Sequence, residues 1–289
     1  MNLGVIFALG ALLGWSFGDF SIQKTVRAIG NVRAIFYISI TGGILLLPFI
    51  WREIIPAFSS VSNFPLIIFA CILVLVTALA NFEGLKKGKL SVVLPINGVE
   101  LVIAIALAAL ISGERYHSLI YLGIVLVFVG LLLTTITSIK NLTDLKWEKG
   151  VAWALTGAIL LGVSNYTIGL TSRTFSPIFS IWLTHSVAAI ATFLIMLKRK
   201  EISAIRNDLK NHFNIIAAQS LLDNLAWISF AYATTLIPIG IATTISEGYL
   251  ALGAILGMTI NQEKLRRHQL FGVALTIISV LLLSWLIGV

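Results

Sequence analysis

The stretch LSVVLPINGVELVIAIALAALIS, residues 90–112, decides the fold of this chain. It is apolar over a length that crosses the hydrocarbon core of a bilayer, and it carries a single charged side chain, Glu100. The basic run KKGK, residues 86–89, precedes it, and GER, residues 113–115, follows it. This pattern predicts a transmembrane helix, and similar apolar stretches bounded by charge recur along the rest of the sequence.

The composition places nearly the whole chain in lipid. Hydrophobic residues make up 58% of the 289 positions and charged residues 11%, about half of the charge that a soluble domain carries. We therefore predict an all-α membrane protein of ten transmembrane helices, with short connections except for a charged loop at residues 198–211. The predicted spans are residues 3–23, 32–51, 63–85, 90–112, 118–139, 149–171, 176–197, 212–234, 238–261 and 268–288.

The basic residues predict the orientation of these helices. The formal net charge is +8, but the basic residues lie in connections next to the spans and do not form a phosphate-binding face. Of the 20 Lys and Arg residues, 17 follow odd-numbered spans, against Arg52, Arg115 and Arg173 on the other side. Excess positive charge marks the cytoplasmic side. We expect a protein of the cell (cytoplasmic) membrane with both termini outside the cytoplasm and no nucleic-acid partner.

The two halves of the sequence resemble each other weakly. Glu114 ends the fourth predicted span and Glu263 ends the ninth, and nine residues after each acid a glycine, Gly123 or Gly272, begins the next span. Five spans per half, an odd number, place the two copies in opposite orientations. Inverted repeats are typical of transporters that alternate access around a site near the membrane centre. The predicted units are a first repeat, residues 1–140, a linker, residues 141–148, and a second repeat, residues 149–289.

The sequence resembles the drug/metabolite transporter superfamily, specifically its EamA-type ten-helix members. The resemblance is carried by Gly10–Ser16, by Pro95 and by the two pairs of an acid and a glycine described above. It covers nearly the whole chain as two tandem units, and it implies a secondary carrier of unspecified substrate. Thr244 stands where the overlay of the halves would place a second proline. Familiar members have both termini in the cytoplasm, opposite to the orientation that the charge count predicts.

Ionisable side chains inside a membrane are costly, and they mark function or pairing. Glu100, Asp223 and Glu247 fall near the middle of the fourth, eighth and ninth spans, and no Lys or Arg lies at comparable depth. Such carboxyl groups can exchange a proton or bind a cationic substrate. The alternative is a protonated carboxyl that is hydrogen-bonded to a neighbouring helix. Because all three lie in repeat-related spans, we interpret them as candidates for proton coupling.

Helical spacing places polar and aromatic side chains beside these acids. In the eighth span Gln219, Asp223 and Trp227 recur every four residues, and in the ninth Thr244 precedes the acid by three. Aromatic faces beside carboxylates suit an amine or quaternary ammonium group. We therefore predict a small-molecule transporter for a cationic or zwitterionic metabolite, working by alternating access with proton coupling. The predicted substrate-binding residues are Trp15, Asn97, Glu100, Gln219, Asp223, Trp227, Thr244 and Glu247.

The first span carries a face of small residues. Gly10, Gly14 and Gly18 recur every four residues and predict close packing against another helix. Trp15 and Asp19 are also four residues apart. Asp19 lies near the predicted cytoplasmic end of the helix, where pairing and gating are equally open roles.

Several other residues are interpreted as structural. Glu114 and Glu263 lie at span ends and are expected to pair with helix ends or loops. Glu83 is expected to pair with the lysines that follow it, and His185 to be a histidine of the packed core.

An intramembrane enzyme acting on a lipid-linked substrate is the main alternative. Metalloprotease chemistry would need a His-Glu-x-x-His motif and isoprenoid transfer would need clustered aspartates, and the sequence has neither. Cys71 is the single cysteine, so an internal disulfide is excluded. We expect no cofactor and no resident metal. The substrate, the direction of transport and the choice between monomer and homodimer stay open.

Overall fold

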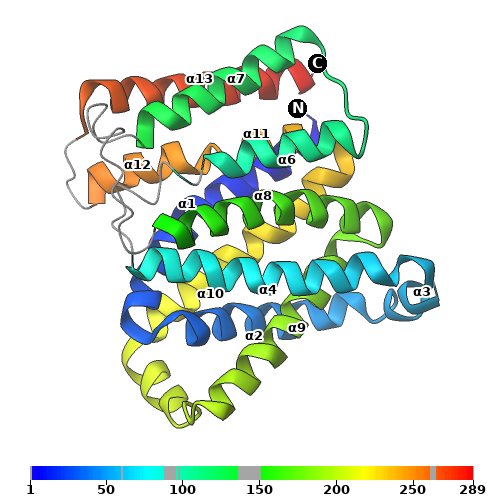
Figure 1. Cartoon of the computed structure of the whole chain (residues 1–289), viewed down its shortest axis with the longest axis vertical. Coiled ribbons are helices and arrows are strands. Elements are labelled where there is room, and N and C mark those ends of the chain that lie inside the picture. Colours follow the sequence, from blue (N-terminus) through cyan, green and yellow to red (C-terminus); the bar gives the residue numbers. More distant parts are fainter. Residues whose placement is uncertain are drawn as a thin grey trace.

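The computed structural model describes residues 2–59, 61–87, 96, 98–135, 151–260 and 265–288. All regular elements in these ranges are helices. They lie side by side across the long dimension of the molecule, and the N- and C-terminal ends lie at the same end of the helices (Figure 1). We call this the terminal end, which also contains the connection at residues 111–117. The opposite end, with Gly30 and Lys87, is called the basic end.

The helices follow the predicted spans. Those of the first repeat are α1 (Leu3–Ile29), α2 (Asn31–Ile50), α3 (Ile54–Ser59), η1 (Val61–Asn63), α4 (Phe64–Lys87), α6 (Val99–Leu110) and α7 (Ser118–Thr135). Those of the second are α8 (Val151–Thr174), α9 (Pro177–Lys198), α10 (Ala204–Leu236), α11 (Ile239–Ser246), α12 (Tyr249–Ile260) and α13 (Arg267–Gly288).

The all-α fold with ten spans is confirmed. Seven segments of the described chain have the length and hydropathy of a membrane span, and α11 and α12 together form one of them. The shorter apolar helices α6 and α7, and the part of α10 beyond a kink at His212, supply the others. The predicted linker, residues 141–148, lies outside the described residues, so the exact limits of the two repeats stay a prediction.

The connection expected at residues 198–211 is largely helical, which corrects the prediction of a loop. α10 begins at Ala204, and its first turns precede the kink. Arg33 of α2 forms an ion pair of 2.8 Å with the buried Asp208, and the Tyr37 hydroxyl donates to the same carboxylate. These partners lie far away in the sequence. They hold the charged segment against α2, which spacing within the segment does not reveal.

The two repeats are interleaved. α1 of the first repeat packs along α10 of the second, and α8, the counterpart of α1, packs along α4. Equivalent helices also pack on each other, namely α2 on α9, α7 on α13 and α6 on α11, although α6 packs more extensively on α8 than on α11. The α7–α13 pair lies at one edge of the molecule, and α2 and α9 lie at the other (Figure 1). The helices of both repeats therefore alternate through the molecule and do not form two separate halves.

Glycines form the closest of these contacts. A Cβ atom at Gly14 would lie only 2.8 Å from the Cβ of Ala226, so α1 and α10 touch there. A Cβ atom at Gly272 of α13 would lie 2.7 Å from the Gly130 carbonyl oxygen of α7. The glycine face predicted on the first span is therefore a packing face, and its partner is α10.

The ninth span is interrupted near its middle. α11 ends one residue before Glu247, and α12 begins two residues after it. In the fourth span, α6 begins at Val99 and is preceded by Gly98. When the halves are overlaid on their span-end acids, Gly98 takes the place of Glu247. The residues that lead into Gly98 lie mostly outside the described ranges, so the interruption is described for the ninth span. An interrupted helix near the membrane centre is where transporters of this architecture hold their ligands.

Candidate functional site

An aromatic cluster lies where α1, α10 and α12 meet. The ring centroid of Trp15 is 5.0 Å from that of Trp227 and 6.0 Å from that of Tyr249. Phe230 completes the cluster at 5.5 Å from Trp15. Trp15 is buried and Trp227 is half-buried. The fold thus brings two of the predicted site residues together from opposite repeats.

Two aspartates lie one helical turn from this cluster, toward the basic end. Asp19 follows Trp15 by four residues on α1, and Asp223 precedes Trp227 by four residues on the antiparallel α10. The helices are close here, since a Cβ atom at Gly18 would lie 3.6 Å from the Asp223 amide nitrogen. The two carboxylates are near enough to interact electrostatically. Within the described residues, neither receives a hydrogen bond or an ion pair.

Two glutamates, one from each repeat, meet at the centre of the molecule. Glu100 is 0% exposed and Glu247 is 1% exposed. Their carboxyl groups are adjacent to each other and to the Tyr249 side chain. Asn165 of α8 donates a hydrogen bond of 3.3 Å to Glu247. In the part of the chain that the structure describes, the second oxygen of Glu247 and the Asn165 amide oxygen have no hydrogen-bond donor, while Glu100 has the Tyr249 hydroxyl and the Glu247 carboxyl beside it.

The electrostatic character of this centre is strongly acidic. Its four carboxyl groups come from α1, α6, α10 and the break between α11 and α12. The Lys and Arg residues that the structure describes lie in connections or within the first or last two turns of helices. Burial of a charged group without a partner is costly, so these carboxyl groups need protons or a positively charged ligand.

The remaining predicted site residues are placed differently. Gln219 donates 3.2 Å to the Ala34 carbonyl, so its amide joins α10 to α2. Thr244 is fully buried and donates 2.6 Å to the Gly240 carbonyl of its own helix. Asn97 lies outside the described residues. The substrate-binding roles of these three residues therefore stay predictions.

Asn165 and Tyr249 belong to the centre, but the sequence analysis did not single them out. The repeat contained a signal for Tyr249, because overlaying the halves on Glu114 and Glu263 puts it at the position of Glu100. Asn165 had no comparable signal, since its helix carries several polar residues of similar spacing.

Of the residues interpreted as structural, Glu83 and His185 have the expected kind of partner, and Glu263 lies outside the described residues. Glu83 forms an ion pair of 2.6 Å with Lys87 and accepts a hydrogen bond of 2.9 Å from Asn31. His185 is buried, and its Nδ1 lies 3.0 Å from the Ile181 carbonyl of its own helix.

Comparison with known proteins agrees with this architecture. The family model for EamA-like transporters matches residues 2–136 and, a second time, residues 148–285. A solved crystal structure superposes with a TM-score of 0.75 over 99% of this chain and 98% of the other, at 12% sequence identity, which is a likeness of fold alone. A search of curated proteins found no match.

The fold and the duplicated family match define a multi-pass integral membrane transporter. The two matches cover nearly all of the sequence. The chain therefore belongs to the EamA-like transporter family, within the drug/metabolite transporter superfamily. The resemblance seen in the sequence is confirmed.

Proposed function

We propose that this transporter is a secondary active carrier that moves a small cationic or zwitterionic metabolite, such as an amine or amino acid, across the cytoplasmic membrane by proton-coupled alternating access. One observation carries the proposal: the centre presents the buried Asp223, Glu100 and Glu247 and the half-buried Asp19, with no cationic side chain beside them among the described residues. Buried charges are stable when they are paired. A cationic substrate would supply the positive charge in the loaded carrier, and protons would supply it in the empty one.

The surroundings of Asp223 support a cationic substrate. The half-buried Trp227 lies one helical turn from this carboxylate, and its ring packs edge-on against Trp15. The face of an indole ring attracts an ammonium group, and the adjacent carboxylate adds a direct ionic contact. The pair of rings and the pair of aspartates would therefore hold the charged end of the substrate.

The adjacent glutamates support coupling to protons. Two carboxyl groups side by side in a buried site cannot both carry charge without a large cost, so they bind and release protons as a pair. Glu100 belongs to the first repeat and Glu247 to the second. Any movement of one repeat against the other would change the distance between the two groups. Such a change would alter their affinity for protons.

Ligand-dependent thermal stability of the purified protein tests the substrate class. A panel of amines, amino acids, sugars and organic anions would be compared at about pH 6 and pH 8. A ligand present at about 100 times its dissociation constant stabilises the folded state by about 2.7 kcal/mol. We expect an amine or an amino acid to raise the unfolding temperature, and Asp223→Asn to abolish that shift. Glu83→Gln, at the basic end, is the matched control and should keep it.

Two results would contradict the proposed substrate class. Stabilisation by sugars or organic anions alone would leave the membership of the family intact and remove the cationic substrate. An amine shift that survives in Asp223→Asn would place the ligand away from the acidic centre.

A further inference from the structure

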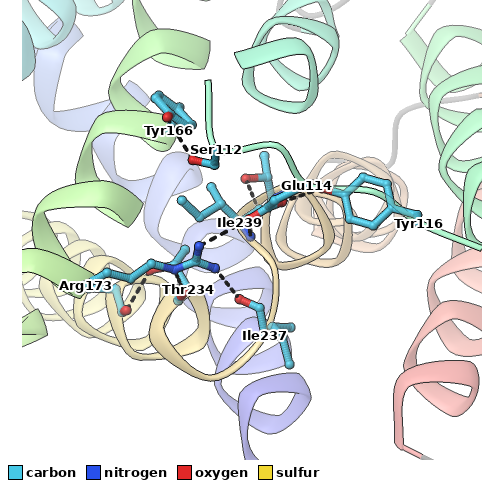
Figure 2. Close-up of polar contacts among 11 residues, drawn as sticks. Ser112, Glu114, Tyr116, Tyr166, Arg173, Thr234, Ile237 and Ile239 are labelled. Atoms are coloured by element: carbon cyan, nitrogen blue, oxygen red, sulfur yellow. Dashed lines mark hydrogen bonds and ion pairs between the residues drawn. The ribbon is translucent and has the colours of Figure 1, made fainter. Parts of the chain in front are cut away.

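One carboxylate ties the two repeats together at the terminal end. Glu114, in the connection between α6 and α7, accepts hydrogen bonds from the backbone amides of Ile239 at 2.7 Å and Gly240 at 3.0 Å. These residues begin α11, and Figure 2 shows the carboxylate directed at that helix start. A negative charge is favourable there, because the free amide groups and the helix dipole both present positive charge.

Arg173, in the last turn of α8, completes this contact. Its Nη1 lies 3.3 Å from Oε1 of Glu114. Its Nε donates 2.6 Å to the Thr234 carbonyl, and its Nη2 donates 3.0 Å to the Ile237 carbonyl. One guanidinium therefore joins the α6–α7 connection, α8 and the end of α10 (Figure 2).

Tyr116 contributes one more hydrogen bond from the same connection. Its hydroxyl donates to Glu114. Burial, together with the adjacent carboxylate, raises the pKa of Tyr116 above its usual range, so the hydroxyl keeps its proton and remains a donor.

The cluster holds the half-helix that leads to the central acids. α11 has 8 residues, and Glu247 follows it directly. At about 1.5 Å per residue, the start of the helix lies about 12 Å from the centre. A displacement of this start would therefore move the wall of the path between the terminal end and the acidic site.

The chemistry of the contact suits a reversible closure. Alternating access requires one end to close while the other opens, by movement of one repeat against the other. The α1–α10 and α7–α13 contacts are close-packed around glycines, so they cannot separate without leaving voids. The contact at Glu114 consists of polar groups at the end of the helices, where water can replace each hydrogen bond.

We propose that Glu114 and Arg173 form the latch that closes the transport path at the terminal end. They are joined in the conformation described, and they separate when the centre is reached from that end. The inference rests on the alternating access of the proposed function, but not on the substrate class or on proton coupling.

Thiol labelling tests the latch without any substrate. In a Cys71→Ala background, Thr244→Cys on α11 reports access to the centre. Ile55→Cys reports access to the terminal end, since Ile55 on α3 is 79% exposed. A membrane-impermeant maleimide is applied to reconstituted protein from the side on which Ile55→Cys is labelled.

Addition of Glu114→Gln is expected to speed modification of the Thr244→Cys variant by about tenfold or more, because a charge-assisted hydrogen bond typically contributes more than the free energy of a tenfold ratio. Labelling of the Ile55→Cys variant should not change. If Glu114→Gln does not fold, Arg173→Lys serves as the second variant, because it keeps the charge and loses the fork that binds two carbonyls.

Ser112→Ala is the matched control. It removes the hydrogen bond of 2.9 Å between Ser112 and Tyr166, which joins the same connection to α8, and it leaves Glu114 and its partners in place (Figure 2). If Ser112→Ala raises the labelling rate of the Thr244→Cys variant equally, the helices have loosened generally and the latch is overturned. The same holds if Glu114→Gln raises the labelling rate equally when the maleimide is applied at the basic end. Unchanged labelling in both Glu114→Gln and Arg173→Lys would overturn it as well. None of these results depends on the ligand panel, so the two proposals fail independently.

Discussion

Among the residues that the structure describes, the central glutamates and Asn165 lack some of the hydrogen-bond donors that buried oxygen atoms need. Asn165 donates a hydrogen bond from its side-chain nitrogen to Glu247, yet its own oxygen and the second oxygen of Glu247 have no donor in the described chain. Buried acceptors without donors cost free energy that packing has to offset. Their concentration around two glutamates supports a site that is completed by protons and a bound cation.

Glu247→Gln is expected to uncouple transport from protons. Glutamine keeps the size of the side chain but cannot bind and release a proton. Exchange of substrate at equal pH should therefore continue, while accumulation driven by a proton gradient should be lost. Uptake into proteoliposomes, with and without a gradient, measures both processes. Glu83→Gln, which alters an ion pair with Lys87 at the basic end, should behave as wild type. Full gradient-driven accumulation in Glu247→Gln would contradict the coupling role.

Gln219 shows how far spacing along a helix can predict a site. It shares a stripe of α10 with Asp223 and Trp227, but its amide donates to Ala34 of α2. Spacing determines the face on which a side chain lies. It does not determine which neighbouring helix that face meets at each turn, because crossing helices replace one another along the stripe. The acids were easier to identify, because a charged group inside a membrane costs free energy whichever helix lies beside it. The tryptophans were then identified by their helical spacing from the acids.

The helices were predictable because lipid imposes a simple requirement on apolar length, while their ends depend on local and distant contacts. α1 continues beyond its predicted end to Ile29, and Gly30 then turns the chain with a φ of 91°. α10 starts earlier than predicted, where Asp208 meets Arg33. The pairing of α1 with α10 could not be derived from the sequence, since short connections favour neighbours along the chain.

Gly14→Ala is expected to destabilise the protein by about 1–3 kcal/mol through the contact between α1 and α10. The added methyl group would lie 2.8 Å from the Cβ of Ala226 and 3.1 Å from its Cα, so backbone must move. Thermal unfolding in detergent measures the loss. Gly253→Ala is the matched control, because no atom lies within 4 Å of a Cβ there, and its unfolding temperature should not fall.

A compensating change gives the same contact a second test. Ala226→Gly, added to Gly14→Ala, should recover part of the lost stability by removing the opposing methyl group. Equal unfolding temperatures for Gly14→Ala and Gly253→Ala would show that α1 and α10 are not in close contact at this point.

The whole molecule has two ends of unequal charge. At the terminal end Arg173 is engaged by Glu114, while Arg52 and Arg115 are exposed. At the basic end Arg33 and Lys87 are likewise engaged, by Asp208 and Glu83. Because the count of Lys and Arg, and not the net charge, governs orientation, the excess of basic residues still predicts that the basic end faces the cytoplasm.

Two single-cysteine variants test this orientation in intact cells. In the Cys71→Ala background, an impermeant maleimide is expected to label Ile55→Cys, at the exposed terminal end, from outside. It should label Ala28→Cys, at an exposed position of the basic end, only after the cells are permeabilised. The reverse pattern would place both termini in the cytoplasm, as in familiar members of the superfamily. Labelling of both variants from outside would mean that the chain inserts in two orientations.

The interleaving of the repeats has a consequence for the nascent chain during synthesis. Ser16 of α1 donates to the Tyr249 carbonyl, 233 positions later in the sequence. At 5–20 residues per second of synthesis, α1 waits on the order of 10–50 s for its partners to leave the ribosome. For most of that time Trp15 and Asp19 lack their native neighbours from the second repeat, because Asp223, Trp227 and Tyr249 are synthesised last. We expect α1 to be held by the insertion machinery until synthesis is nearly complete, and a prematurely terminated chain to be recognised for degradation by this helix.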